Sequence, residues 1–268
     1  DLWAMINGEH AETINETVNT QPLMLAAGIA TYRAYLEAGG KEPSVMAGHS
    51  LGEYTALVVA GSLSFVDALK LVRLRAELMQ SAVPQGTGSM AAILGLDDDA
   101  VRAVCAEAAQ GEVVEAVNFN SPGQVVIAGS IAAVERAIET AKAKGAKRAL
   151  PLPVSVPSHC LLMKPAAEKL AEALKAVDIQ PPKIPVIHNA DVASYNNAEQ
   201  IKDALVRQLY SPVRWTETVN ALVAQGIIQS AECGPGKVLA GLAKRINKEA
   251  SCSALTNTEQ VSAFIAAH

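Results

Sequence analysis

The stretch Gly48-His49-Ser50-Leu51-Gly52 has the G-x-S-x-G spacing of a serine nucleophile held on a sharp turn. Glycines on both sides let the backbone bend tightly between a strand and a helix, so that the Ser50 hydroxyl stands exposed. The backbone N–H groups that follow then point to where an oxyanion forms. An apolar run at 45–47 precedes the motif and a helical pattern at 51–60 follows it. The sequence therefore predicts that Ser50 is a nucleophile.

A serine nucleophile needs a general base, and the chain has 5 histidines. His10 and His268 lie near the two ends, and His49 is next to Ser50 but is expected to point away from it. His159 precedes a predicted helix, and His188 ends a predicted strand. Because a helix N-terminus disfavours the imidazolium form, it would keep His159 neutral, as a base must be. His159 is the favoured base, and His188 stays open.

These residues need an α/β framework, and the sequence predicts one. Helices are expected at 20–36, 51–60, 67–79, 165–177, 201–209, 216–224 and 237–246, with strands at 45–47, 185–188 and 227–231. The apolar run 45–47 is typical of a strand buried in a parallel sheet. The expected large domain spans residues 1–84 and 154–268 and has a parallel central sheet.

A second pattern interrupts this framework at residues 85–153. Strands are expected at 90–94, 113–118, 124–128 and 148–154, and helices at 98–109 and 131–144. The turn Asn120-Ser121-Pro122-Gly123 separates the middle two strands. The order β-α-β-β-α-β is that of a ferredoxin-like domain, so residues 85–153 are predicted to form a small inserted domain.

Composition excludes several classes of protein. Of 268 residues, 50% are hydrophobic and 18% charged, which excludes a disordered chain. A net charge of −5 gives no overall basic footprint for nucleic acid. No apolar run approaches the ~18 residues of a membrane helix. The 4 cysteines are too widely spaced for a disulfide framework or a zinc site. We expect a soluble, cytoplasmic protein.

Five segments in this order resemble the acyltransferase family, and in particular the malonyl-CoA:acyl carrier protein transacylases of bacterial type II fatty acid synthesis. They are 47–54 around the serine, 84–92, Asn118-Phe119-Asn120-Ser121-Pro122-Gly123-Gln124, Val156-Pro157-Ser158-His159 and Gly234-Pro235-Gly236-Lys237. The resemblance runs nearly from end to end. It implies an α/β-hydrolase-like large domain with an inserted ferredoxin-like domain, in agreement with the patterns above.

The resemblance also implies roles for individual residues. Ser50 would accept the acyl group, His159 would be the base, and the backbone N–H of Leu51 would lie in the oxyanion hole. Arg75 would grip the free carboxylate of malonyl, a task that suits the planar guanidinium. The helix pattern alone would instead make Arg75 a surface residue. The backbone carbonyl of Gln208 would orient the histidine.

The implied reaction moves malonyl from malonyl-CoA to the phosphopantetheine thiol of acyl carrier protein through a malonyl-serine ester. No cofactor, metal, nucleic acid or membrane is expected to take part. One alternative is a serine thioesterase or esterase, which would have an aspartate near His159 and no carboxylate-binding arginine. The other is a carrier-protein-binding form with weak activity.

Two glycine-rich motifs and two basic groups have weaker interpretations. Gly86-Thr87-Gly88-Ser89-Met90-Ala91 and Gly234-Pro235-Gly236-Lys237 are poor candidates for nucleotide sites, because the first follows a helix instead of a strand and the second lacks phosphate-loop spacing. Two basic groups could contact an acidic carrier protein, although ordinary solvated helix faces explain them equally well. They are Lys142, Lys144, Lys147 and Arg148, and Lys244, Arg245 and Lys248.

The family resemblance also raises an expectation about the start of the chain. Members begin with an apolar strand and a G-Q-G-S-Q loop, whose glutamine supplies a second oxyanion N–H. Neither precedes Asp1. With family-like spacing, about forty residues would be absent, and the 268-residue form would be a poor transacylase.

Overall fold

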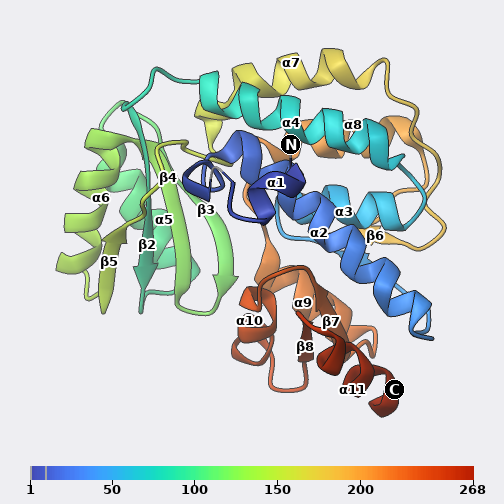
Figure 1. Cartoon of the computed structure of the whole chain (residues 1–268). Coiled ribbons are helices and arrows are strands. Elements are labelled where there is room, and N and C mark those ends of the chain that lie inside the picture. Colours follow the sequence, from blue (N-terminus) through green and yellow to red (C-terminus); the bar gives the residue numbers. More distant parts are fainter. Residues whose placement is uncertain (1, 10) are drawn as a thin grey trace.

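The computed structural model describes residues 2–9 and 11–268, so the sequence-based remarks on Asp1 and His10 lie outside the described residues. Figure 1 shows three parts. A helix-rich unit contains segments from both sides of the inserted domain, a four-stranded sheet with two helices lies beside it, and a smaller lobe at the C-terminus lies below. The mixed α/β class predicted from the sequence is confirmed.

Two short parallel strands lie inside the helix-rich unit. These are β1 (Met46–Ala47) and β6 (Val186–Ile187), with Met46 opposite Val186. The helices around them are α2 (Thr17–Glu37), α3 (Leu51–Val59), α4 (Phe65–Ser81), α7 (Lys164–Leu174) and α8 (Ala198–Gln208). Short α1 (Leu2–Ile6) and the 3₁₀ turn η1 (Ala11–Thr13) precede them. Burial of leucines from these helices, including Leu57 and Leu170, builds the main core around the strand pair.

Local signals set where several of these helices begin. Ser64 accepts a hydrogen bond from the Asp67 N–H and caps α4. Asn197 caps α8 by accepting from two backbone N–H groups. Helix α2 starts at Thr17, earlier than predicted, so Pro22 lies inside the helix and not in its first turn. Since one face of α2 is buried and the helix packs against α3 and α4, this packing outweighs the missing proline N–H.

The neighbouring sheet contains four antiparallel strands in the order β3-β4-β2-β5. They are β2 (Gly88–Leu94), β3 (Val114–Ser121), β4 (Gln124–Ser130) and β5 (Arg148–Pro151). Helices α5 (Asp98–Ala109) and α6 (Ile131–Ala143) pack on one face of this sheet. This is the ferredoxin-like arrangement expected from the sequence, and all six elements fall within residues 85–153.

The two faces of this sheet bury different side chains, because strand residues alternate in direction. On β4, Val125 and Ile127 face the helices and join the core of the small unit. Val126 and Ala128 face the other way and pack in a cluster with Cys160. The sheet therefore supports the segment that carries His159.

The C-terminal lobe has a separate pair of parallel strands, β7 (Gln229–Cys233) and β8 (Ser251–Leu255), with Gln229 opposite Ser251. Its helices are α9 (Trp215–Ala224), α10 (Val238–Ile246) and α11 (Thr258–Ala267). The sequence analysis placed the first strand at 227–231 and predicted neither β8 nor α11. Strand β8 has the sequence SCSAL, whose small and polar residues carry little strand signal.

The 3₁₀ turn η2 (Leu161–Met163) leads directly into α7. It ties the His159 segment to a helix of the main core, because Met163 is fully buried in that core. Among the described residues, no helix has both the length and the hydropathy needed to cross a membrane.

Candidate active site

The chain bends sharply at Ser50, between the end of β1 and the start of α3. Ser50 has a φ of 52°, a left-handed conformation that non-glycine residues seldom adopt. At Gly48, an added Cβ would lie 2.0 Å from the backbone C and O of Gly52, so no larger residue fits without moving the turn. The strand, turn and helix predicted from the G-x-S-x-G motif are thus present, and the geometry is strained.

His159 lies beside the nucleophile. Its Nε2 is 2.8 Å from Ser50 Oγ, and its Nδ1 is 2.8 Å from the backbone carbonyl of Gln208. Because a carbonyl oxygen only accepts, Nδ1 carries the proton, and the Nε2 lone pair faces the serine hydroxyl. The imidazole is therefore held in the tautomer that can receive the Ser50 proton.

Burial keeps this imidazole neutral. His159 is 3% exposed, and desolvation lowers its pKa from 6.5 to about 3, helped by the nearby positive charge of Arg75. The hydrogen bond to Gln208 acts in the opposite direction on the pKa. Burial, and not the helix N-terminus expected from the sequence, is therefore the main cause of the neutral state of His159.

Arg75 is buried, with 1% of its surface exposed, so the surface-residue alternative is wrong. Its Nη2 donates to Ser50 Oγ at 3.0 Å and to Gln208 Oε1 at 2.9 Å, and its Nη1 donates to Gln21 Oε1 at 2.6 Å. The guanidinium also lies over the ring of Tyr54. All three oxygen acceptors are neutral, and burial lowers the pKa of Arg75. A cation in this setting is suited to bind a carboxylate.

The other described histidines near the turn have different partners. His188 Nδ1 is 2.6 Å from the Glu53 carboxylate, and both side chains are fully buried. His49 Nε2 is 2.8 Å from Asn120 Oδ1, in the hairpin of the small sheet, and its ring packs against Trp215. The structure therefore brings His159 to Ser50, and it uses His188 and His49 as links between elements.

Two backbone N–H groups at the turn have different environments. The Ser50 N–H donates to Asn189 Oδ1 at 2.7 Å, so it already has a partner. Leu51 is the first residue of α3, and a helix leaves its first N–H groups without an intrahelical acceptor. Of these two donors, that of Ser50 is therefore occupied within the protein, and that of Leu51 has no intrahelical acceptor.

Sequence reasoning missed three residues of this network: Gln21, Glu53 and Asn189. Asn189 had a usable signal, because it follows a predicted strand and the carboxyl ends of neighbouring parallel strands meet at one edge. Glu53 had only its position three residues after Ser50. Gln21 lies on α2, far from any motif, and carried no signal.

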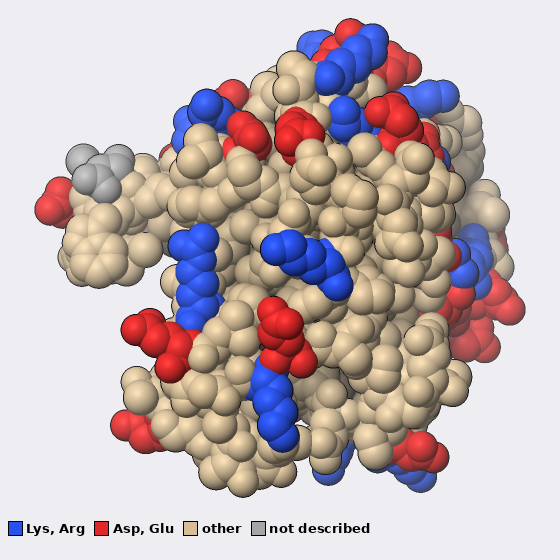
Figure 2. All heavy atoms as spheres, turned by 90° about the vertical axis from the view of Figure 1, so that its right-hand side faces the viewer, with Lys and Arg blue, Asp and Glu red and all other residues tan. Residues whose placement is uncertain are grey.

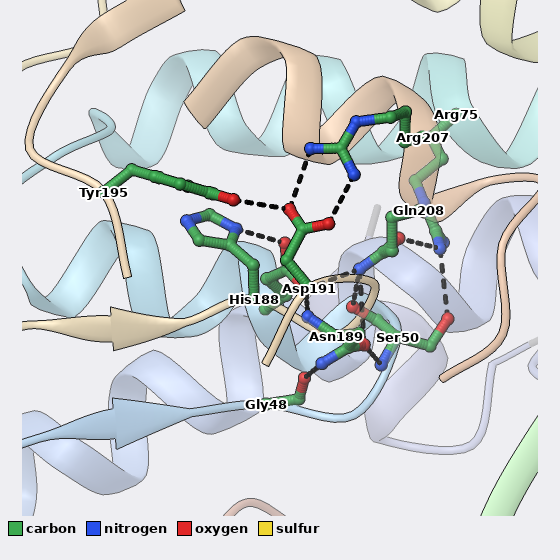
Figure 3. A network of polar contacts seen from close by, with 10 residues as sticks. Gly48, Ser50, Arg75, His188, Asn189, Asp191, Tyr195, Arg207 and Gln208 are labelled. Atoms are coloured by element: carbon green, nitrogen blue, oxygen red, sulfur yellow. Dashed lines mark hydrogen bonds and ion pairs between the residues drawn. The ribbon is translucent and has the colours of Figure 1, made fainter. Parts of the chain in front are cut away.

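The network is shown in Figure 3. Asn189 and Gln208 approach Ser50 from the end of β6 and the end of α8, and Arg75 reaches the serine hydroxyl from α4. Side chains from three separate segments therefore converge on Ser50 in this view.

The four cysteines all have raised pKa values. Burial raises the pKa of Cys105 and of Cys160 to about 12, that of Cys233 to about 11, and it also raises the pKa of Cys252. Cys160 follows His159, but its thiol donates to the Pro157 carbonyl. None of the four has the lowered pKa of a reactive thiol.

The two glycine-rich segments, at residues 86–91 and 234–237, lack the surroundings of a nucleotide site. Residues 84–91 run from the end of α4 into β2, which is the reverse of a dinucleotide-binding turn. At the start of α10, Glu232 Oε2 accepts from the Ala240 N–H at 2.8 Å. A carboxylate therefore already occupies the helix N-terminus that an anion would need.

A cavity of about 400 Å³ adjoins His159 on the side of α5 and β3. Two arginines line it, and each is paired with a carboxylate: Arg102 with Asp99, and Arg214 with Glu217. The buried cation with only neutral partners is therefore Arg75, beside Ser50, and not a residue of this cavity.

This fold and site define an acyl transferase, and the acyl transferase domain family matches residues 3–258. The malonyl CoA-acyl carrier protein transacylase of Escherichia coli K12 is 57% identical over 265 residues, which cover 99% of this chain and 86% of the relative. That of Haemophilus influenzae is 60% identical over 92% of this chain and 79% of the relative. The chain belongs to the malonyl CoA-acyl carrier protein transacylase family.

Solved structures agree with this assignment. The malonyl CoA-acyl carrier protein transacylase of Coxiella burnetii superposes with a TM-score of 0.98 at 49% identity, covering 99% of this chain and 84% of that one. A malonyl-transacylase in complex with a type II PKS acyl-carrier protein also has a TM-score of 0.98, at 55% identity, with coverage of 100% and 87%. The expected α/β-hydrolase-like fold with its inserted domain is confirmed.

Substitution by alanine at the two glycines of the turn should change the free energy of unfolding in opposite directions. Gly48→Ala should lower the free energy of unfolding by at least about 1–3 kcal/mol, because the methyl group meets backbone atoms that cannot give way. Gly52→Ala meets nothing within 4 Å and lies in α3, where alanine is favoured by up to about 1 kcal/mol. Urea denaturation measures both, and equal destabilisation by the two substitutions would contradict the geometry of the turn.

Proposed function

We propose that this chain moves a malonyl group from malonyl-CoA to the phosphopantetheine thiol of an acyl carrier protein, with Ser50, His159 and Arg75 as the working side chains. One observation carries the assignment of roles. Ser50 Oγ lies between a neutral base, His159 Nε2 at 2.8 Å, and a buried cation, Arg75 Nη2 at 3.0 Å. The family membership supports the overall reaction, which belongs to fatty acid biosynthesis.

In the first step Ser50 Oγ attacks the thioester carbonyl while its proton passes to His159 Nε2. The carbonyl oxygen becomes an oxyanion, and the Leu51 N–H donates to it. The C–S bond then breaks, CoA leaves as the thiol with the proton from His159, and a malonyl-serine ester remains.

In the second step the carrier-protein thiol gives its proton to His159 and attacks the ester. The C–O bond to Ser50 breaks, and His159 returns the proton to the serine oxygen. One thioester is consumed and one is formed, so the reaction balances without a metal, a redox cofactor or an energy source.

Arg75 gives this reaction its preference for malonyl. The malonyl carboxylate offers the guanidinium two oxygens in place of neutral acceptors, and such a pair is strongest away from water. Acetyl has no carboxylate to offer. The arrangement also argues against the thioesterase alternative, because the group on His159 Nδ1 is the Gln208 carbonyl and an arginine is present.

The carrier protein is the second substrate. Figure 2 views the side of the molecule away from the four-stranded sheet, where acidic and basic side chains are mixed among broad uncharged areas.

The two basic groups named in the sequence analysis stay candidates for carrier contact, although Lys142 and Lys144 are already paired with Glu139 and Glu107. A cytoplasmic location is part of this proposal.

Ser50→Ala should abolish covalent labelling by radioactive malonyl-CoA, because the Ser50 hydroxyl is the one that His159 contacts. His159→Ala should slow the labelling by about two to four orders of magnitude. The exposed Ser81→Ala on α4 should leave it unchanged. Label that persists on the Ser50→Ala protein would disprove the role of Ser50.

Arg75→Ala should reduce malonyl transfer sharply and raise the relative use of acetyl-CoA. Removing one partner of a desolvated charge pair costs about 2–5 kcal/mol, and acetyl forms no such pair. Arg73→Ala, on the exposed side of the same helix, is the matched control. Competition assays with both acyl-CoAs give the ratio, and an equal loss for the two substrates would make Arg75 a structural residue.

The pH profile of acylation tests the state of His159. With a pKa near 3, the imidazole stays in its proton-accepting form throughout the neutral and mildly acidic range. We expect equal acylation rates at about pH 7.5 and pH 5.5, whereas a base with an ordinary pKa would retain only about a tenth of its activity at the lower value. Single-turnover labelling at the two pH values measures the acylation rate. A rate that titrates with a midpoint near pH 6.5 would contradict a buried, neutral base.

A further inference from the structure

One buried carboxylate, that of Glu53, lies beneath the residues proposed to react. Glu53 is in the first turn of α3 and is 0% exposed. Its Oε1 is 2.6 Å from His188 Nδ1. Its Oε2 accepts from the Asn189 N–H at 2.8 Å and from Gln208 Nε2 at 3.1 Å. Three donors from two other segments therefore end on a single side chain that does not itself touch the place where substrate binds.

The first of these connections leads to the turn. The Asn189 side chain donates from Nδ2 to the Gly48 carbonyl at 2.7 Å, and its Oδ1 accepts from the Ser50 N–H at 2.7 Å. It thus bridges the Gly48 carbonyl and the Ser50 N–H, on the N-terminal side of the strained residue, as Figure 3 shows. By holding the Asn189 backbone, Glu53 fixes the side chain that keeps Ser50 in its left-handed conformation.

The second connection leads to the cation. Gln208 Nε2 donates to Glu53 and also to the Ser50 carbonyl at 2.9 Å, while Gln208 Oε1 accepts from Arg75. An amide has one donating and one accepting end. Glu53 and the Ser50 carbonyl both hold the donating end, which leaves the accepting end to face the guanidinium. Without the carboxylate at position 53, the donating end would be held less firmly and the accepting end would be less well directed at Arg75.

The loop that carries His188 and Asn189 is itself held from outside. Arg207 makes a two-pronged ion pair with Asp191, and Asp191 also accepts from the Tyr195 hydroxyl. The His188 ring packs against that of Tyr195. These contacts fix the far side of the network, so Glu53 is held in place to orient the Gln208 amide together with the Ser50 carbonyl.

We propose that Glu53 is a positioning residue that sets the preference for malonyl by orienting Gln208 toward Arg75. This inference rests on the proposed function of Ser50 and Arg75. The carboxylate balances the buried guanidinium through one intervening amide, and it leaves the guanidinium nitrogens without a carboxylate of their own. A glutamate in direct contact with Arg75 would instead compete with the carboxylate of the substrate.

Glu53→Gln tests the proposal, because it removes the charge with almost no change in volume. We expect the ratio of malonyl to acetyl transfer to fall by about ten- to a hundredfold, the effect of misplacing one hydrogen bond to a charged group. Glu199→Gln, an exposed glutamate on α8, is the matched control and should keep the wild-type ratio. A purely structural role for Glu53 would lower both rates by the same factor and leave the ratio unchanged, which would overturn the proposal.

A second variant keeps the test decisive if Glu53→Gln does not fold. The exchange Glu53→Gln with Gln208→Glu retains the charge and the volume but places the carboxylate against Arg75. We expect this protein to lose more of the malonyl preference than Glu53→Gln, and a wild-type ratio would refute the proposal.

The wild-type protein separates this proposal from the proposed function. If malonyl label is found on a residue other than Ser50, the proposed function fails. If wild-type label is on Ser50 and the exchanged residues leave the ratio unchanged, only the role of Glu53 fails.

Discussion

The site depends on a single guanidinium that has been taken out of water and given no carboxylate of its own. Removing such a charge from water is costly unless polar groups surround it, and here they come from α2, the turn at Ser50 and α8. The three segments must therefore meet at Arg75 on α4. The core leucines of the same helices make that meeting favourable, so the apolar packing and the polar site are parts of one arrangement.

The four-stranded sheet holds the segment that carries His159. Its helix-facing side chains make a core of their own, which frees the opposite face to hold the chain around Cys160. His159 adopts a φ of 65°, and it keeps this unfavourable conformation between the sheet on one side and η2 on the other. Both Ser50 and His159 are thus held in strained backbone by parts of the molecule that take no part in the chemistry.

Much of this could be predicted from sequence because the signals are local. The order of predicted strands and helices in residues 85–153 identified the ferredoxin-like unit, with α5 exact at both ends. The G-x-S-x-G spacing located the turn. The choice between His159 and His188 could not be made from the residues alone, since it depends on a distance between segments 109 positions apart. The burial of Arg75 was missed for the same reason: periodicity shows which side chains share a helix face, but not what covers that face.

The raised pKa values of the four cysteines have a consequence for an enzyme that handles activated thioesters. A thiolate attacks a thioester readily, whereas a protonated thiol does not. With pKa values of about 11 to 12 at Cys105, Cys160 and Cys233, and a raised value at Cys252, the chain presents almost no thiolate of its own at neutral pH. The four cysteines are therefore poor acyl acceptors, so the thiols of the two substrates react with an acyl group in preference to those of the protein.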